Sequence, residues 1–157
     1  MQPAIPADGD FPLADDQATT RLGAAVGRVL ARGEAVCLSG PLGAGKSTLA
    51  RGMIRALTSP TEEAPSPTFT LVQTYEGEGL ELAHFDLYRL AGAEEVEELG
   101  LDEALDAGAA VIEWPERLQG RLPPDRLDIT ISLEAQGASR LARLTAHGRW
   151  KGRSIEF

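Results

Sequence analysis

The sequence is short of several residue types on which common functions depend. It has one cysteine, two histidines and no asparagine among 157 residues. A single thiol, Cys37, rules out an internal disulfide framework and a cysteine zinc site, and two histidines are too few for a multi-histidine metal centre. Guanine-specific GTPases read their base with an Asn-Lys-x-Asp motif, which a chain without asparagine cannot contain.

Positive charge and long apolar stretches are scarce as well. The chain carries 15 Lys and Arg against 24 Asp and Glu, a net charge of −9. This balance disfavours a protein that grips nucleic acid or an anionic membrane by electrostatics alone, because both need clustered basic residues. No apolar stretch approaches the roughly 18 residues that cross a bilayer, and residues 1–10 lack the features of a signal peptide. We therefore expect a reduced, cytoplasmic protein without membrane contact.

The length and the hydrophobic patterns predict one α/β domain. We expect a flexible lead-in over residues 1–10, the domain over 11–147 and a loose basic tail over 148–157. An amphipathic helix capped at its start by Asp15 or Asp16 precedes a buried strand and a second helix. The expected elements are helices over 15–31, 46–57 and 93–107, strands over 11–14, 35–39 and 109–112, and hairpins from 68–75 with 80–86 and from 127–133 with 140–146.

The strongest motif is the run Gly40–Ser47, GPLGAGKS, which matches G-x-x-x-x-G-K-[ST] in full. An apolar strand precedes it and a helix follows, as a phosphate-binding loop requires. Its glycines let backbone N–H groups curl around a phosphate, and the helix directs its positive end at the same anion. Lys46 would reach the β- and γ-phosphates and Ser47 would ligate Mg²⁺. Thr48 either bonds the α-phosphate or is a plain helix residue.

Such a loop needs an acidic partner for the metal at the end of a neighbouring strand. Asp86 ends one predicted strand and Glu113 ends another. The strand before Glu113 is wholly apolar, as a central parallel strand would be, whereas the Asp86 strand carries polar residues and suggests half-exposure. Glu113 is therefore the preferred metal acid, and an ordinary solvated carboxylate is the alternative for either residue.

Taken together, the motifs resemble one family. GPLGAGKST is followed by Ser66-Pro67-Thr68-Phe69, by His84 to Leu90 (HFDLYRL) and by Ile112-Glu113-Trp114. In this order and spacing they are similar to the bacterial tRNA threonylcarbamoyladenosine biosynthesis ATPases, the TsaE family, from about residue 13 to 146. Ser47 stands where the family usually has threonine, which keeps the hydroxyl.

The resemblance implies a P-loop fold with three α/β/α layers, a mixed, largely parallel sheet and a C-terminal hairpin. It implies a small ATPase that uses ATP and Mg²⁺ and is stimulated by two partner proteins. Those partners transfer a threonylcarbamoyl group to N6 of adenosine 37 in tRNA, and the ATPase supports their turnover. This chain would meet tRNA only weakly or through the partners, with Arg149, Lys151 and Arg153 as the segment that would reach RNA.

Residue roles follow from the same resemblance. Lys46, Asp86 and Glu113 would be catalytic, with Asp86 as base or as metal-positioning acid beside the γ-phosphate. Ser47, Glu113 and Asp86 would hold Mg²⁺. Thr68 would sense the γ-phosphate, and Trp114 would pack beside the site or meet a partner. The residues expected to bind the nucleotide are Leu42, Gly43, Ala44, Gly45, Lys46, Ser47, Thr48 and Thr68.

Some alternatives stay open from sequence alone. His84 is either a packed strand histidine or a catalytic base, and Arg89 is either an arginine finger or half of a structural ion pair. The chain as a whole could be a nucleotide-sensing module without turnover, or a small-molecule kinase. The kinase hypothesis is disfavoured by residues 93–106: kinases usually have an arginine-rich lid in this region, and this segment contains no arginine.

Overall fold

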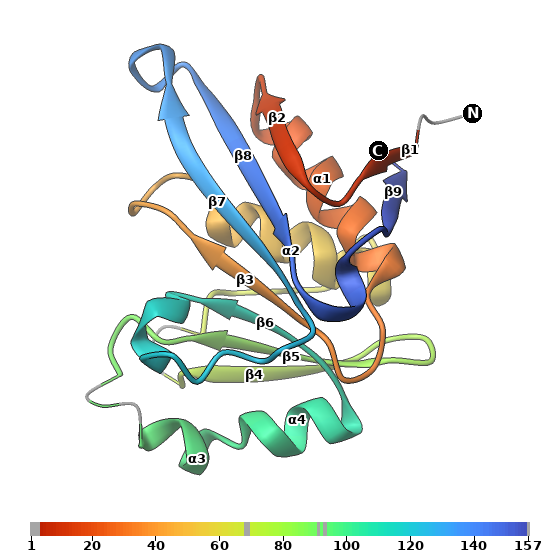
Figure 1. The fold of residues 1–157 in the computed structure, drawn as a ribbon, viewed down its shortest axis with the longest axis vertical. Coiled ribbons are helices and arrows are strands. Elements are labelled where there is room, and N and C mark those ends of the chain that lie inside the picture. The colour runs from red at the N-terminus through yellow and green to blue at the C-terminus, as the bar shows by residue number, and fades with distance from the viewer. Residues whose placement is uncertain (1–3, 68–69, 91, 93, 157) are drawn as a thin grey trace.

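The computed structural model describes residues 4–67, 70–90, 92 and 94–156. Its centre is a seven-stranded sheet in the order β2-β8-β7-β3-β6-β5-β4 (Figure 1). Two further strands, β1 and β9, form a separate pair. The strands are β1 Ala4–Pro6, β2 Gly9–Leu13, β3 Ala35–Ser39, β4 Val72–Glu76, β5 Glu81–Asp86, β6 Gly108–Glu113, β7 Arg126–Glu134, β8 Ser139–Ala146 and β9 Ser154–Glu156.

The sheet is parallel in its middle and antiparallel at both sides. Strands β7, β3, β6 and β5 run parallel to one another, while β4 pairs antiparallel with β5 and β8 pairs antiparallel with both β7 and β2. Tight turns join the antiparallel neighbours β4–β5 and β7–β8, whereas parallel neighbours need longer crossovers. The predicted mixed α/β sheet with a C-terminal hairpin is confirmed, and the parallel pairs are confined to its four central strands.

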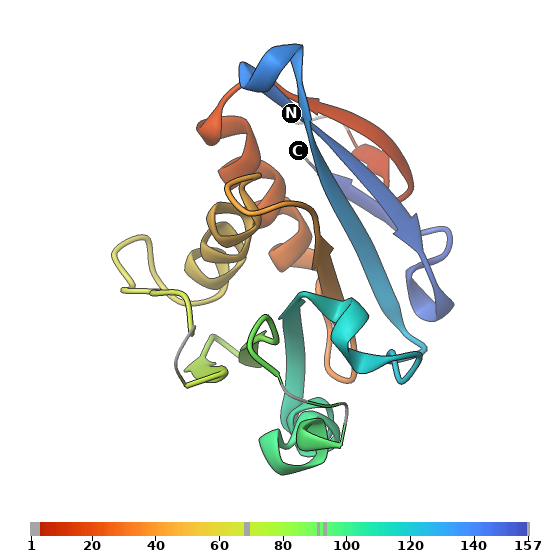
Figure 2. The same cartoon turned by 90° about the vertical axis from the view of Figure 1, so that its left-hand side faces the viewer.

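Helices cover both faces of the sheet (Figure 2). Helices α1 Asp16–Val29 and α2 Lys46–Leu57 lie side by side on one face, and α3 Glu95–Leu99 and α4 Leu101–Ala107 belong to the other side. Side chains of β3 alternate between two separate hydrophobic clusters, so that Val36 packs on the α1/α2 side and Cys37 on the opposite side. Burial raises the pKa of the Cys37 thiol to about 12, so that this side chain behaves as a small buried hydrophobe.

Several predicted boundaries agree with the structure. Helix α2 and strand β3 span the predicted residues, and Asp15 caps α1 by accepting from the N–H of Ala18 at 2.9 Å. The helix expected over 93–107 is divided at Gly100 into α3 and α4. Strand β4 starts at Val72, later than the predicted residue 68. Residues 68 and 69 lie outside the described part of the chain. No described helix combines the length and the apolar character that a membrane span requires.

The two ends of the described chain differ from the expected flexible lead-in and loose tail. Strands β1 and β9 pair antiparallel, and the side chain of Trp150 is fully buried. Arg153 forms a bidentate ion pair at 2.7 Å with Glu34, a carboxylate that is itself inaccessible to solvent. These contacts join residues far apart in sequence, so no local sequence pattern predicted them. Arg149 also pairs with Asp125, so two of the three basic residues that we considered for RNA contact are engaged within the fold.

Helices α1 and α2 approach closely because glycines line their contact. An added Cβ at Gly23 would overlap the carbonyl oxygen of Leu49, and one at Gly27 would lie 3.1 Å from the carbonyl oxygen of Met53. This close approach sets the position of α2, whose first residue belongs to the P-loop motif.

Replacing Gly23 by alanine should therefore destabilise the protein, although alanine favours helices. We expect Gly23→Ala to lower the free energy of unfolding by about 3 kcal/mol, because overpacking a tight interface forces backbone shifts. Urea denaturation followed by circular dichroism measures this loss, and Gly27→Ala should lose less because its contacts are longer. A gain of about 1 kcal/mol in Gly23→Ala, as helix propensity alone would produce, would contradict the close-packed interface.

Candidate functional site

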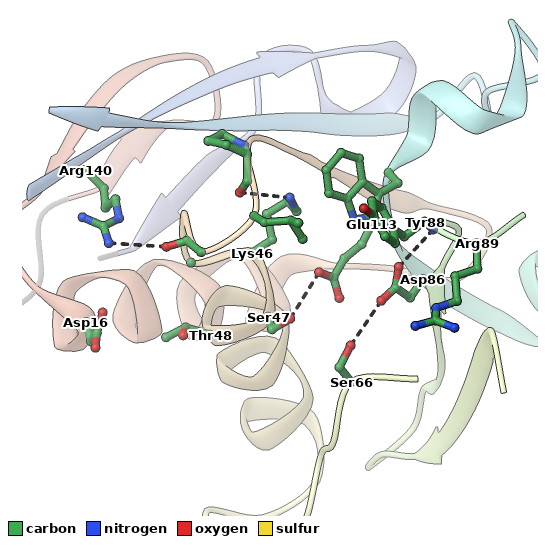
Figure 3. A pocket seen from close by; sticks show the side chains of 15 residues that line it. Asp16, Lys46, Ser47, Thr48, Ser66, Asp86, Tyr88, Arg89, Glu113 and Arg140 are labelled. Carbon is green, nitrogen blue, oxygen red and sulfur yellow. Dashed lines mark hydrogen bonds between the residues drawn. The ribbon is translucent and has the colours of Figure 1, made fainter. Parts of the chain in front are cut away.

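The P-loop motif opens onto a cavity of about 560 Å³. Figure 3 shows the side chains that line it, which come from the motif, from the carboxyl ends of β5 and β6 and the residues just after them, from the loop before β4, and from the starts of α1 and β8. Its volume suits a small-molecule site. The lining residues are Asp16, Pro41, Leu42, Gly43, Gly45, Lys46, Ser47, Thr48, Ser66, Asp86, Tyr88, Arg89, Glu113, Trp114 and Arg140.

The loop between β3 and α2 depends on glycine at two positions. Gly43 has φ +81° and Gly45, the N-cap of α2, has φ +111°, which are backbone angles that other residues rarely adopt. Left-handed backbone at Gly43 and Gly45, with Ala44 between them, makes a concave row of backbone N–H groups that suits an anion. The loop and the helix start together provide the phosphate cradle that the motif predicts.

Lys46 lies inside this cradle and is almost inaccessible to solvent. Its ammonium donates to the carbonyl oxygens of Gly40 and Pro41, the latter at 3.3 Å, and stands 3.9 Å from the centre of the Trp114 ring. Burial lowers the pKa of Lys46, and the nearby charges of Glu113, Glu116 and Asp86 oppose that shift. A phosphate group entering the cradle would add a further charge that favours the ammonium form.

The two candidate acids stand side by side at the sheet's carboxyl edge. Asp86 and Glu113 are register partners across the parallel pair β5–β6. Both residues are buried, at 7% and 2% exposure, so neither is an ordinary solvated carboxylate. The expectation of a half-exposed β5 was wrong, because its side chains pack into hydrophobic clusters on both faces of the sheet and Leu82 to Asp86 are all buried. A single sequence shows polar residues in a strand without showing what covers them.

The two acids have different partners. Glu113 accepts a hydrogen bond from the Ser47 hydroxyl at 3.3 Å through Oε1, and its Oε2 lies 2.6 Å from Nε2 of His84. Asp86 accepts from the Ser66 hydroxyl at 3.2 Å and from the N–H of Tyr88 at 3.1 Å. Glu113 thus contacts the start of α2, while Asp86 contacts the loop that contains Ser66 and the backbone just after β5.

The donor set fits Mg²⁺ held together with a nucleotide. No group of three or more His, Cys, Asp or Glu in the described residues could hold a metal by itself. Mg²⁺ prefers oxygen ligands and usually keeps several waters, binding through one or two carboxylates and the phosphates of its substrate. The hydroxyl of Ser47 and the carboxylates of Glu113 and Asp86 supply that kind of incomplete oxygen set at the mouth of the cradle.

Most of the predicted nucleotide-binding residues line the cavity, with two exceptions. Ala44 belongs to the loop but is buried, and its N–H donates to the carbonyl oxygen of Pro41 at 3.1 Å. Thr68 lies outside the described residues, and the neighbouring Ser66 reaches the cavity. Of the residues with open roles, Arg89 lines the cavity, and Trp114 packs against Tyr88 with ring centres 5.0 Å apart.

Arg140 is a cavity residue that sequence reasoning missed. It lies at the start of β8, and its guanidinium donates to the carbonyl oxygens of Ala44 at 3.1 Å and Gly43 at 3.4 Å. In a trans peptide the C=O and the following N–H point in opposite directions. By holding the Ala44 carbonyl, Arg140 therefore sets the direction of the Gly45 N–H. Nothing local distinguishes this arginine from others in the hairpin, so only the fold could reveal it.

We expect Arg140→Ala to weaken nucleotide binding about tenfold, because the loop would lose about 1–1.5 kcal/mol of hydrogen bonding that orders its amides. Isothermal titration with ADP measures the change. Arg143→Ala is the matched control, since Arg143 lies on the same strand but pairs with exposed Asp10. Equal ADP affinity in the Arg140→Ala variant and the wild-type protein would show that the loop keeps its shape without the guanidinium.

Comparison with known proteins identifies a family to which this chain is similar. The family model described as threonylcarbamoyl adenosine biosynthesis protein TsaE matches residues 13–142. The chain is 42% identical over 122 residues to the tRNA threonylcarbamoyladenosine biosynthesis protein TsaE of Treponema pallidum, covering 77% of this chain and 89% of that one. It is 39% identical over 138 residues to the protein of that name from Nostoc, covering 85% and 83%.

A solved structure shows the same similarity in three dimensions. The crystal structure of Bacillus subtilis YdiB superposes with a TM-score of 0.73 and 28% sequence identity. The match covers 94% of this chain and 88% of that one, so the arrangement of the sheet and its helices is shared over nearly the whole length.

Proposed function

This chain belongs to the TsaE family of threonylcarbamoyl adenosine biosynthesis proteins, and from that membership we propose that it binds ATP with Mg²⁺ and hydrolyses the ATP. One observation carries the proposal beyond the family name. One cavity at the P-loop is lined by Lys46 and Ser47 of the motif and by the buried acids Asp86 and Glu113. The two acids are far from the motif, and from each other, in sequence.

The hydrolysis would support modification of adenosine 37 in tRNA by two partner proteins that perform the threonylcarbamoyl transfer. The chain's net charge of −9 fits a subunit that acts on proteins and leaves most of the RNA contact to them. A cytoplasmic location belongs to this proposal, because the partners work on tRNA there.

Each site residue has a separate task in the proposed reaction. Lys46 and the loop N–H groups bind and orient the phosphates, and the lysine charge offsets negative charge that develops during phosphoryl transfer. Ser47 and Glu113 hold the metal directly or through water, and Mg²⁺ when bound neutralises phosphate oxygens. Asp86 helps to position the metal or accepts the proton of the attacking water, and it lies beside Glu113 at the same edge of the sheet.

The isolated protein should turn over slowly. Arg140, a cavity arginine, is engaged with loop carbonyls, and Asp86 already accepts hydrogen bonds from Ser66 and Tyr88. Docking of the partner proteins would have to reorganise these groups or add what is missing. This expectation separates an activated ATPase from a constitutive one.

Single-turnover ATP hydrolysis, measured with and without the two partner proteins, tests the proposal. We expect slow ADP formation by the isolated chain and faster formation with the partners. ATP binding with no ADP formed in either case would instead support a nucleotide-sensing module. Phosphate transfer to an added nucleoside or sugar would support a kinase. A pull-down against the partner proteins with ATP present measures the association directly.

A further inference from the structure

His84 lies directly behind the proposed metal acid and has no part in the mechanism described so far. It stands two residues before Asp86 on β5, on the strand face that packs toward α1 and α2. Its side chain is 2% exposed, and that of Glu113 is 3% exposed. Neither group therefore has bulk water as a partner. Their contact, with Nε2 of His84 2.6 Å from Oε2 of Glu113, is a short, buried hydrogen bond between side chains of neighbouring strands.

The two oxygens of Glu113 are directed to different partners. Oε1 faces the Ser47 hydroxyl at 3.3 Å, on the side of the P-loop and the cavity (Figure 3). Oε2 is occupied by His84. The carboxylate plane is thus held at both ends, and one oxygen is left on the side where the nucleotide and its metal would lie.

The hydrogen bonding also assigns the histidine tautomer. A carboxylate only accepts hydrogen bonds, so Nε2 must carry the hydrogen that lies between the two groups. Nδ1 is buried and has no hydrogen-bond partner in the described part of the chain. The only polar contact that the structure gives the ring is therefore the one to Glu113. A histidine that served as a proton carrier to the nucleotide would need a second polar contact.

We propose that His84 is a positioning residue for the metal site: its Nε2–H holds Oε2 of Glu113, so that Oε1 stays turned toward Ser47 and the metal. This inference rests on the proposed function, because it assumes that Glu113 binds a nucleotide-associated cation. Partners that orient a metal-ligating side chain typically account for 10- to 100-fold in metal affinity.

Loss of His84 should turn the Glu113 carboxylate toward another partner rather than leave it without one. The ammonium of Lys46 is close enough for the Glu113 charge to raise its pKa. Without the hydrogen bond to His84, the carboxylate would be drawn toward that ammonium. Such a pair would withdraw one group from the metal and the other from the phosphates. The expected consequence is a metal-binding defect.

Binding of Mn²⁺ in the presence of ADP, followed by electron paramagnetic resonance on the full chain, measures this defect without relying on activity. We expect His84→Leu to weaken Mn²⁺ binding about 10- to 100-fold and to leave ADP binding in EDTA unchanged. His84→Gln should recover most of the Mn²⁺ affinity, since its side-chain amide can still donate to Oε2.

The chain supplies a matched control. His147, its other histidine, also contacts a carboxylate, with Nε2 3.0 Å from Oδ2 of Asp128. This pair is partly exposed, and neither residue lines the cavity. His147→Leu should bind Mn²⁺ and ADP like the wild-type protein. Wild-type Mn²⁺ affinity in a folded His84→Leu variant would overturn the positioning role, and so would a His84→Gln variant as weak as His84→Leu.

A spectroscopic readout covers the case in which His84→Leu does not fold. With only two histidines, ¹⁵N spectra of the wild-type imidazoles can be assigned by comparison with His147→Leu. We expect the hydrogen of His84 on Nε2, and a changed signal in Glu113→Gln. A hydrogen on Nδ1 with none on Nε2 would overturn the proposal. Wild-type protein that binds ADP but no Mn²⁺ would overturn the metal part of the proposed function and this inference with it, whereas the other outcomes bear on His84 alone.

Discussion

Replacing Lys46 by alanine should abolish ATP turnover, with a fall in rate of about 10³-fold or more. The ammonium is the cationic side chain at the centre of the loop, where it bonds to the carbonyl oxygens of Gly40 and Pro41 and lies against Trp114. Removing one preorganised group that stabilises transition-state charge costs about 10²–10³ in rate. Lys46 should also contribute to binding the ground-state phosphates, so the combined loss in kcat/KM should exceed that range.

The chain offers a simple control for this variant. Its only other lysine is Lys151, an exposed residue near the C-terminus. Lys151→Ala removes the same charge and should keep wild-type turnover. Both variants should unfold cooperatively near the wild-type denaturant midpoint, since Lys46 points into the cavity rather than into the hydrophobic core. Full ATPase activity in Lys46→Ala would mean that hydrolysis takes place elsewhere, and the site assignment would have to be abandoned.

The second large effect should come from Asp86→Asn, which we expect to lower kcat about 10²- to 10³-fold, the range that a positioned acid or base contributes. Asparagine keeps the size of the side chain but has one acceptor oxygen where aspartate has two. In Asp86 the Ser66 hydroxyl and the Tyr88 N–H bond to different oxygens, which asparagine cannot reproduce. More importantly, it lacks the charge that the proposed mechanism places beside the γ-phosphate and the metal.

The Mg²⁺ dependence of this variant separates the two roles that we left open for Asp86. A metal-positioning acid predicts a higher half-saturating Mg²⁺ concentration together with the lower kcat. A base predicts the lower kcat with unchanged Mg²⁺ dependence. Asp102→Asn is the control, because Asp102 is an exposed acid on α4 outside the P-loop cavity. Wild-type turnover in Asp86→Asn would remove this residue from the catalytic set.

Much of the fold was predictable because the signals are local. The start of α2 follows from the P-loop motif, which requires a helix to begin at its lysine. The short apolar run of β3 and the alternation in β7 and β8 are periodicities that a reader can see within ten residues. The ends of the chain were misjudged because β1 and β9 are short strands with little pattern of their own, and each is stabilised by the other.

The sequence predicted which types of residue form the candidate site better than it predicted which of these residues contact one another. Lys46 and Ser47 are adjacent in the motif, so their joint position follows from the sequence. The contact of Ser47 with Glu113 spans 66 residues, and that of Arg140 with Ala44 spans 96. Neither could be read from spacing, because each depends on the strand order and register of the sheet.

The sequence by itself determined the phosphate cradle, since the glycines, the lysine and the helix that follows are consecutive and their chemistry depends on backbone angles. It also restricted the metal acids to two strand ends. Only the tertiary structure decided that both acids are buried side by side, that His84 occupies the far oxygen of Glu113, and that Arg140 holds the outside of the loop. The physical reason is that hydrogen bonds between distant segments require the parallel register of β5 and β6 and the packing of β8 beside the loop, which only the folded chain establishes.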